Sequence, residues 1–207
     1  PNEYINIMVY PFTDSQILGI STFPYSLKDF FLEGTQQVSA SWITLENLSF
    51  PYCISINSSY IYEQSTDERI NQNDAAITLA HELGHYLGLR HVFSEGGTTS
   101  MCTDTDYCKD TPSYNRSEYE QWLNNLDKQN KYQLKDLAKR YSCEKGEYEA
   151  HNIMDYAYCF YNEITLEQRK RIRHILNYSP LIPGPKESRI DTRGVQGRLN
   201  LPICIMK

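Results

Sequence analysis

Eleven residues, His81 to His91, constrain this chain more than any other stretch. They read His-Glu-Leu-Gly-His-Tyr-Leu-Gly-Leu-Arg-His. Residues four apart lie on nearly the same face of a helix, so His81 and His85 can bind one metal ion together. Glu82 then lies beside the ion, where a base for a zinc-bound water belongs. Gly88 can adopt a backbone conformation that ends the helix and returns His91 as a third ligand.

Three protein ligands leave a fourth position on zinc open, which is the arrangement of a catalytic site, whereas a structural site normally has four protein ligands. The alternative is an amphipathic helix with histidines on its surface or in its core. For a chain of this composition the full pattern arises by accident with a chance on the order of one in 10⁵. It also uses three of the five histidines. The stretch therefore predicts a catalytic zinc site.

The same stretch resembles the signature of the metzincin clan of zinc endopeptidases, in which H-E-x-x-H-x-x-G-x-x-H is followed by a methionine turn. Residues 152–156, Asn-Ile-Met-Asp-Tyr, are similar to the methionine turn of the pappalysin branch. Residues 102–112, Cys-Thr-Asp-Thr-Asp-Tyr-Cys-Lys-Asp-Thr-Pro, resemble the loop of that branch that contains cysteine and Asp-Thr-Pro. The matches cover residues 74–178, and a bacterial secreted or lipoprotein type is compatible with them.

The resemblance implies an α+β fold of the metzincin-like zincin type. We expect a single metalloprotease catalytic domain over residues 1–207, a length that suits one domain. A mixed twisted sheet and the active-site helix would form an upper subdomain, residues 1–91, above a cleft. An irregular, disulfide-linked lower subdomain, residues 92–207, would contain a C-terminal helix. In metzincins an edge strand of the sheet pairs with the bound peptide, and the order of the chain assigns that role to residues 52–62.

The methionine turn contributes two expected site residues. In the family a methionine side chain forms an apolar floor beneath the metal, a position that Met154 matches, although a lone methionine is otherwise core filler. Tyr156 matches the position from which several metzincins offer a phenol to the zinc or to the developing oxyanion. A buried structural tyrosine is the alternative reading of Tyr156.

The residues after the turn bear on the cleavage preference. Pappalysins that cut beside basic residues use acidic groups, some of which follow the methionine turn closely. Here no carboxylate follows Tyr156 before Glu163. The sequence therefore favours an apolar or aromatic preference at least as much as a basic one.

The loop after His91 is rich in Asp and Thr oxygens, which suit a hard cation such as calcium. In calcium-binding pappalysins the ligands come from positions that correspond here to Glu95, Asp106 and Thr111, with the carbonyl of Lys109. The alternative is an acidic, solvated loop that disulfides tie down. The sequence leaves both readings open.

The six cysteines form an even set. Histidines already serve the metal, so disulfides are the favoured use of the cysteines, although their spacing does not decide the pairing. We expect Cys102–Cys143 and Cys108–Cys159 from the resemblance, and Cys53–Cys204 by elimination. Disulfides indicate an oxidising location: secreted, periplasmic or at the cell surface, including a lipid anchor on a removed N-terminus.

Charge and hydropathy exclude two classes of partner. The net charge of −6 gives no electrostatic reason to expect nucleic acid. No apolar run approaches the ~20 residues that a membrane helix needs. The expected partner is a protein or peptide substrate, and we expect a monomer.

Alternating apolar residues predict strands over residues 4–10, 38–45 and 52–56. Residues 19–24 look like a loop, and the chain beyond residue 180 looks like an extended tail that Cys204 fixes in place.

Three helical segments are expected. The active-site helix should start at a cap near Asp74, and residues 117–141 should form one helix or two shorter ones. Thr165 and Gln168 form a capping-box pattern at the start of the last helix.

These features together predict a zinc-dependent endopeptidase that hydrolyses peptide bonds with a zinc-bound water and Glu82 as general base. The alternative is a catalytically silent, metzincin-like binding module on the cell surface. An intact Glu82 argues against the binding module, because a site without activity has no need of the base.

Overall fold

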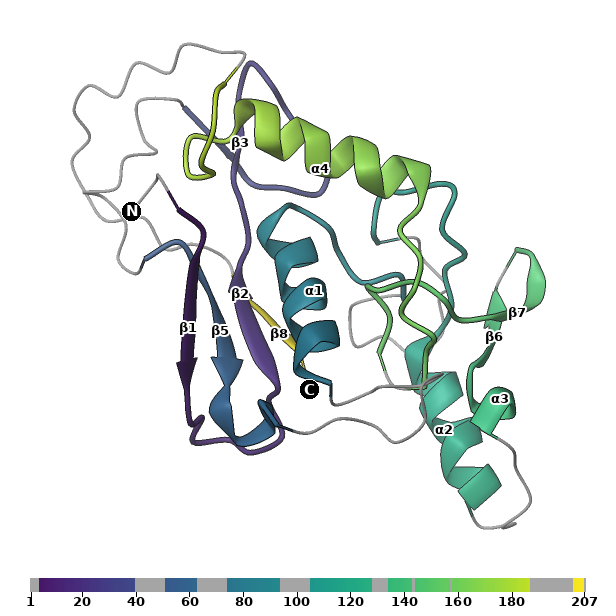
Figure 1. The fold of residues 1–207 in the computed structure, drawn as a ribbon. Coiled ribbons are helices and arrows are strands. Elements are labelled where there is room, and N and C mark those ends of the chain that lie inside the picture. Colours follow the sequence, from purple (N-terminus) through teal and green to yellow (C-terminus); the bar gives the residue numbers. More distant parts are fainter. Residues whose placement is uncertain are drawn as a thin grey trace.

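A computed structural model of the chain describes residues 4–39, 51–62, 74–93, 105–127, 134–142, 144–156, 158–186 and 203–206. Figure 1 shows a sheet on one side of the central helix α1 (Ala75–Tyr86) and a more irregular region on the other side. The last helix, α4 (Leu166–Tyr178), lies across the C-terminal end of α1. The α+β class is confirmed.

Four strands form the main sheet in the order β1-β5-β2-β8. Their bounds are Asn6–Tyr10 for β1, Gly19–Thr22 for β2, Cys53–Asn57 for β5 and Ile203–Met206 for β8. Strand β1 runs parallel to β5, whereas β2 runs antiparallel to both β5 and β8, so the sheet is mixed. Every residue of β5 is buried, as expected for a central strand that packs under a helix.

Two short strand pairs, a 3₁₀ turn and two helices make up the rest of the described elements. Strands β3 (Ser26–Leu27) and β4 (Gln37–Val38) pair in parallel, and β6 (Lys139–Ser142) and β7 (Gly146–Glu149) form an antiparallel pair. A 3₁₀ turn, η3, spans Ser58–Tyr60. The segment expected at 117–141 contains two helices, α2 (Arg116–Asp127) and α3 (Leu134–Leu137). Among the described residues no helix has both the length and the apolar character to cross a membrane.

Two helix starts follow the sequence expectation. The Asp74 carboxylate accepts a hydrogen bond from the backbone N–H of Ala76 at 2.7 Å and caps α1. Thr165 and Gln168 form the full capping box of α4, with each side chain bonded to the other residue's backbone. Local side-chain chemistry therefore fixes where both helices begin.

The predicted strands have three outcomes. Strands β1 and β5 confirm those expected over 4–10 and 52–56. The prediction of a loop at residues 19–24 is wrong, because residues 19–22 form strand β2. A strand of four residues is too short to show an alternating pattern. The strand expected over 38–45 lies mostly outside the described residues.

The edge-strand role expected for residues 52–62 is also wrong. Strand β5 lies between β1 and β2, so both of its edges are already paired. The edge strands of the described sheet are β1 and β8, and β8 pairs with the outer side of β2. The tail expected beyond residue 180 therefore ends in a strand of the main sheet.

Two predicted disulfides are not formed. Cys53 is a free thiol in β5, and Cys204 lies in β8 on the far side of β2. Two strand spacings amount to ~9–10 Å, which exceeds the ~7 Å limit between the Cα atoms of a disulfide. Cys108 and Cys159 are also free thiols, and their Sγ atoms donate to the carbonyls of Asp106 and Asn152. The pair Cys102–Cys143 lies outside the described residues.

Two buried apolar clusters position the active-site stretch. One lies between the sheet, α1 and α4 and includes Ile54, Tyr86 and Ile175. The second lies beneath the end of α1 and includes Leu89, Met154 and Tyr156. Burial of each such side chain contributes about 1.5–3 kcal/mol, so these clusters hold α1 firmly between the sheet and the irregular region.

Candidate active site

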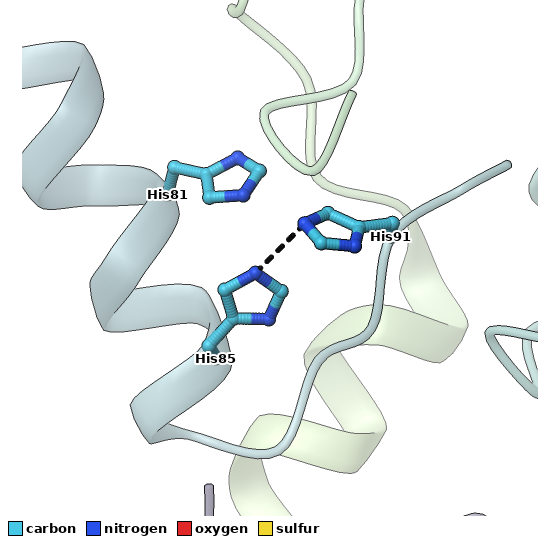
Figure 2. Close-up of side chains that lie close together, drawn as sticks. All are labelled: His81, His85 and His91. Carbon is cyan, nitrogen blue, oxygen red and sulfur yellow. Dashed lines mark hydrogen bonds between the residues drawn. The ribbon is translucent and has the colours of Figure 1, made fainter. Parts of the chain in front are cut away.

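Three histidines converge at the end of α1. His81 and His85 lie one turn apart on α1, and His91 comes from the segment that follows the helix; all three are buried. Figure 2 shows the rings pointing toward one another, and one ligand atom from each lies within 4.8 Å of the others. The Nε2 atoms of His85 and His91 are 3.0 Å apart. Two nitrogens on one tetrahedral zinc lie about 3.3 Å apart, so the donor set fits this ion.

Backbone carbonyls orient two of the rings. The Nδ1 atom of His81 is 2.8 Å from the carbonyl oxygen of Ile153, and that of His85 is 2.8 Å from the carbonyl oxygen of Leu89. A carbonyl can only accept, so each Nδ1 carries the proton. Each Nε2 therefore lacks the proton and offers a lone pair, which is the arrangement found around protein-bound metals.

Gly88 makes the turn that returns His91 to the site. Its φ of +87° is in the left-handed region, where a side chain is strained. A Cβ at this position would also lie 2.8 Å from Cγ1 of Ile175 in α4. The Arg171 guanidinium donates to the Gly88 carbonyl at 3.2 Å, which fixes the turn from the side of α4.

The methionine turn lies directly against α1. The Asp155 N–H donates to the Asn152 carbonyl at 3.1 Å and closes the turn, and Met154 is fully buried. A Cβ at Gly84, in the helix turn between His81 and His85, would overlap Sδ of Met154. The turn therefore supports the helix with a side chain and orients His81 with the Ile153 carbonyl.

Tyr156 lies beside the triad and is buried. Its ring centroid is 4.5 Å from that of His91 and 5.5 Å from that of His81. The Arg116 guanidinium carbon lies 4.5 Å from the ring centroid, on the ring face. The Tyr156 hydroxyl donates to the backbone carbonyl of Ile205 in β8. The structure therefore brings Tyr156 to the site and leaves its role in chemistry a prediction.

Glu82 is a buried residue of α1 that faces strand β2 of the sheet. A Cβ at Gly19 in β2 would lie 2.7 Å from Cγ of Glu82, so the glycine makes this close approach possible. Sequence reasoning missed Gly19 because it was assigned to a loop. A glycine inside a strand can mark a close approach of another group, and that signal could have identified it.

An ion pair beneath the methionine turn was also missed. Arg140 of β6 and Asp155 are both buried, and Nε of Arg140 lies 3.4 Å from Oδ2 of Asp155. Asp155 Oδ1 also accepts from the Tyr114 hydroxyl at 2.5 Å and from the Tyr156 N–H at 2.7 Å. Burial raises the pKa of Asp155, and the charge of Arg140 opposes that rise. No spacing in the sequence links Arg140 to this turn.

Two of the three expected calcium ligands lie together. Thr111 donates its hydroxyl to Oδ2 of Asp106 at 2.6 Å, and the Cys108 N–H donates to Oδ1 of Asp106 at 2.8 Å. Both Asp106 and Thr111 are buried. Glu95 lies outside the described residues. Calcium binding stays a prediction.

Comparison with known proteins gives the family. A family model described as "Pregnancy-associated plasma protein-A" matches residues 42–177. An "Extracellular metalloprotease" of Arthroderma otae is 32% identical over 171 residues, which are 81% of this chain and 49% of that protein. A protein of the same name from Arthroderma benhamiae is 37% identical over 108 residues, which are 51% of this chain and 32% of that protein.

A solved structure, Tannerella forsythia mature mirolysin in complex with a cleaved peptide, is 21% identical with a TM-score of 0.46. The match covers 85% of this chain and 53% of that chain. Matches to the fungal proteins cover half of their length or less.

The family match and the histidine site define the class as a metzincin-like zinc metalloprotease. Within that class the chain belongs to the pregnancy-associated plasma protein-A family of peptidases, the pappalysins.

Proposed function

We propose that this chain is the catalytic domain of a secreted, zinc-dependent endopeptidase. The observation that carries the proposal is the convergence of three buried histidine side chains, with ligand atoms within 4.8 Å, in a pappalysin chain. His81, His85 and His91 would hold the ion. A bound zinc supplies Lewis acidity, which lowers the pKa of water and polarises a peptide carbonyl. The extracellular names of the fungal relatives support secretion.

Glu82 is the proton carrier in this proposal. Its carboxylate takes a proton from the attacking water and delivers it to the nitrogen of the leaving amine. Its position supports this role, because it follows His81 on α1 and is buried against Gly19. A rigid helix holds a catalytic group more accurately than a loop does.

Tyr156 is proposed to donate a hydrogen bond to the oxygen that gains charge during the reaction. Its hydroxyl already donates to one main-chain carbonyl, that of Ile205, beside the triad. Loss of a single donor of this kind lowers kcat by about 10²–10³-fold. Tyr156→Phe should therefore lower kcat far more than it changes zinc content.

The proposed substrate is an extended peptide with apolar or aromatic residues next to the cut. Asp155 is the acidic residue of the methionine turn, and it is engaged by Arg140. The next acidic residue in the chain is Glu163. A peptide library with strong selection for arginine would contradict this preference.

Calcium in the loop around residues 105–111 is a second part of the proposal. Asp106 and Thr111 supply oxygens in one buried contact, and hard oxygens are what calcium prefers. Calcium should raise the melting temperature of the chelator-treated, zinc-reloaded protein, and Asp106→Ala should abolish that increase. An equal increase in both proteins would contradict the site.

The test of activity is cleavage of a denatured protein by the zinc-loaded chain. We expect cleavage that a chelator abolishes and that zinc restores. Glu82→Gln should retain zinc and lose 10²–10⁴-fold in rate, roughly the contribution of a general acid–base group. His81→Ala should lose the metal. Loss of zinc in Glu82→Gln would contradict the role of Glu82, and zinc-loaded protein without cleavage would favour the binding module.

A further inference from the structure

Strand β8 lies where the main sheet meets the histidine site. It runs antiparallel on the outer edge of β2, with Ile20 paired to Ile205 and Ser21 paired to Cys204. It also packs against α1, the helix that carries His81 and His85. Figure 1 shows β8 beside β2, next to the α1 helix. An extended peptide that binds a sheet edge adopts this same kind of pairing.

The backbone of β8 accepts a hydrogen bond from Tyr156 and pairs with the strand that packs against Glu82. The Tyr156 hydroxyl donates to the Ile205 carbonyl, and the Tyr156 ring lies 4.5 Å from that of His91. At the next position, Met206 pairs with Gly19, the residue whose Cα lies against Glu82. Strand β8 therefore lies beside Tyr156 and beside the β2 residue that packs against Glu82.

Two isoleucine side chains of β8 remain partly exposed. Ile203 is 61% exposed and Ile205 is 38% exposed. Because the Ile205 carbonyl faces Tyr156, the backbone groups of its neighbours Cys204 and Met206 face β2. Main-chain pairing with β2 therefore helps to hold β8, and another extended peptide can offer β2 the same main-chain pairing.

We propose that β8 is an intramolecular occupant of the β2 edge to which a substrate peptide would bind, and that a peptide must displace it from β2 before cleavage. The inference rests on the proposed function, because only a peptidase has a substrate for β8 to exclude. When a tethered segment occupies this edge, the apparent dissociation constant of a substrate equals the intrinsic constant divided by the fraction of molecules in which the edge is open. If about 1% of the molecules are open, the apparent affinity is about 100-fold weaker.

A reversible cross-link tests this. Ser21 and Cys204 are directly paired, and paired residues of antiparallel strands have Cα atoms ~4.5–5.5 Å apart, within the range for a disulfide. Ser21→Cys should therefore form a disulfide with Cys204 when oxidised. We expect the oxidised form to cleave denatured protein at least tenfold more slowly than the same variant after reduction, with zinc content unchanged.

The matched control is Ser21→Cys combined with Cys204→Ser, which cannot form the cross-link. Its oxidised and reduced forms should cleave at equal rates. A rate difference between the oxidised and reduced forms of Ser21→Cys alone then comes from the cross-link that fixes β8 to β2. Equal rates for the cross-linked and reduced forms of Ser21→Cys would overturn the proposal. Failure of the two cysteines to cross-link would contradict the pairing of β8 with β2.

A binding experiment separates this inference from the proposed function. The probe is a fluorescein-labelled peptide, Asn-Leu-Pro-Ile-Ser-Ile-Met-Lys, which is residues 200–207 with serine in place of Cys204. In zinc-loaded Glu82→Gln protein, adding Cys204→Pro removes a backbone N–H that faces β2 and should tighten probe binding at least tenfold. The oxidised cross-link should abolish binding.

The outcomes are distinct. Cleavage by no form of the zinc-loaded protein, with the expected binding differences, would defeat the proposed function and leave β8 as the occupant of the β2 edge. Cleavage of denatured protein, together with probe binding that neither Cys204→Pro nor the oxidised cross-link alters, would contradict the inference about β8. The proposed peptidase function would then stand.

Discussion

At the scale of single residues, close packing decides which substitutions the site tolerates. Gly84 is the strongest case, because a Cβ there would overlap Sδ of the fully buried Met154. At an unconstrained helix position, alanine in place of glycine stabilises by about 1 kcal/mol. Here the substitution should destabilise instead: Gly84→Ala should lower the free energy of unfolding of the metal-free protein by about 1–3 kcal/mol.

Denaturant unfolding measures this effect, and a double-mutant cycle with Met154→Ala assigns it. Met154→Ala removes the overlapping atoms, so the cost of Gly84→Ala should disappear in that background. A stabilising Gly84→Ala in the otherwise unchanged chain would contradict the packing of the methionine turn against α1.

The buried pair of Arg140 and Asp155 gives a second prediction at this scale. Arg140→Met leaves Asp155 as an uncompensated buried charge, which costs about 3–5 kcal/mol. Asp155→Asn keeps an oxygen that can accept from the Tyr114 hydroxyl and the Tyr156 N–H. The double variant should therefore be more stable than Arg140→Met alone in urea unfolding. A double variant that is less stable than either single variant would contradict this account.

At the scale of elements, the end of α1 depends on Gly88. An alanine there would be strained by the left-handed backbone conformation, which lowers the free energy of unfolding by about 1–2 kcal/mol. Its Cβ would also lie too close to Ile175 of α4. Because this turn places His91, Gly88→Ala should weaken zinc binding at least tenfold as well as lower stability. A competition titration with a zinc chelator measures the affinity.

Gly146, the first residue of β7, is the matched control for Gly88. Its φ is +80°, and a Cβ there meets nothing within 4 Å. Gly146→Ala should cost about the same backbone strain and leave zinc affinity unchanged. Equal losses of zinc affinity in the two variants would mean that the turn at Gly88 does not position His91.

At the scale of the whole molecule, burial of the triad sets the pH range of zinc binding. A histidine must be neutral to bind zinc. Burial, followed by repulsion from a neighbouring histidine of the triad, lowers the pKa of His85 and His91 well below the usual 6.5. Both rings then stay neutral as the pH falls through 6.5. Zinc content after dialysis should be equal at about pH 8 and pH 6 and fall at more acidic pH.

The metal-free protein should show the same shift in its stability. Below pH 6.5 the unfolded chain binds protons at His85 and His91 that the folded chain does not bind. The free energy of unfolding should therefore fall as the pH drops below 6.5. Loss of zinc already near pH 7, or a metal-free protein that becomes more stable as the pH falls from 7 to 5.5, would contradict the burial of the triad.

The sequence by itself determined the parts of the site that depend on local geometry. The spacing of His81 and His85 follows from the helical repeat, and Gly88 supplies the turn that returns His91. The caps at Asp74 and Thr165 are likewise contacts between near neighbours in the chain. The division of the chain into two subdomains stays a prediction, as do the roles of Glu82 and Tyr156.

Only the tertiary structure decided which distant segments pair. The four residues of β2 are too few to show a pattern, and β8 becomes a strand because β2 offers it an edge. The pairing of Cys53 with Cys204 fails for the same reason, since β2 lies between their strands. The contact of Arg140 with Asp155 joins strand β6 to the methionine turn, and no periodic pattern in the sequence links the two. Strand order and ion pairing depend on where the whole chain places its backbone, whereas helix spacing and caps are fixed within a few residues.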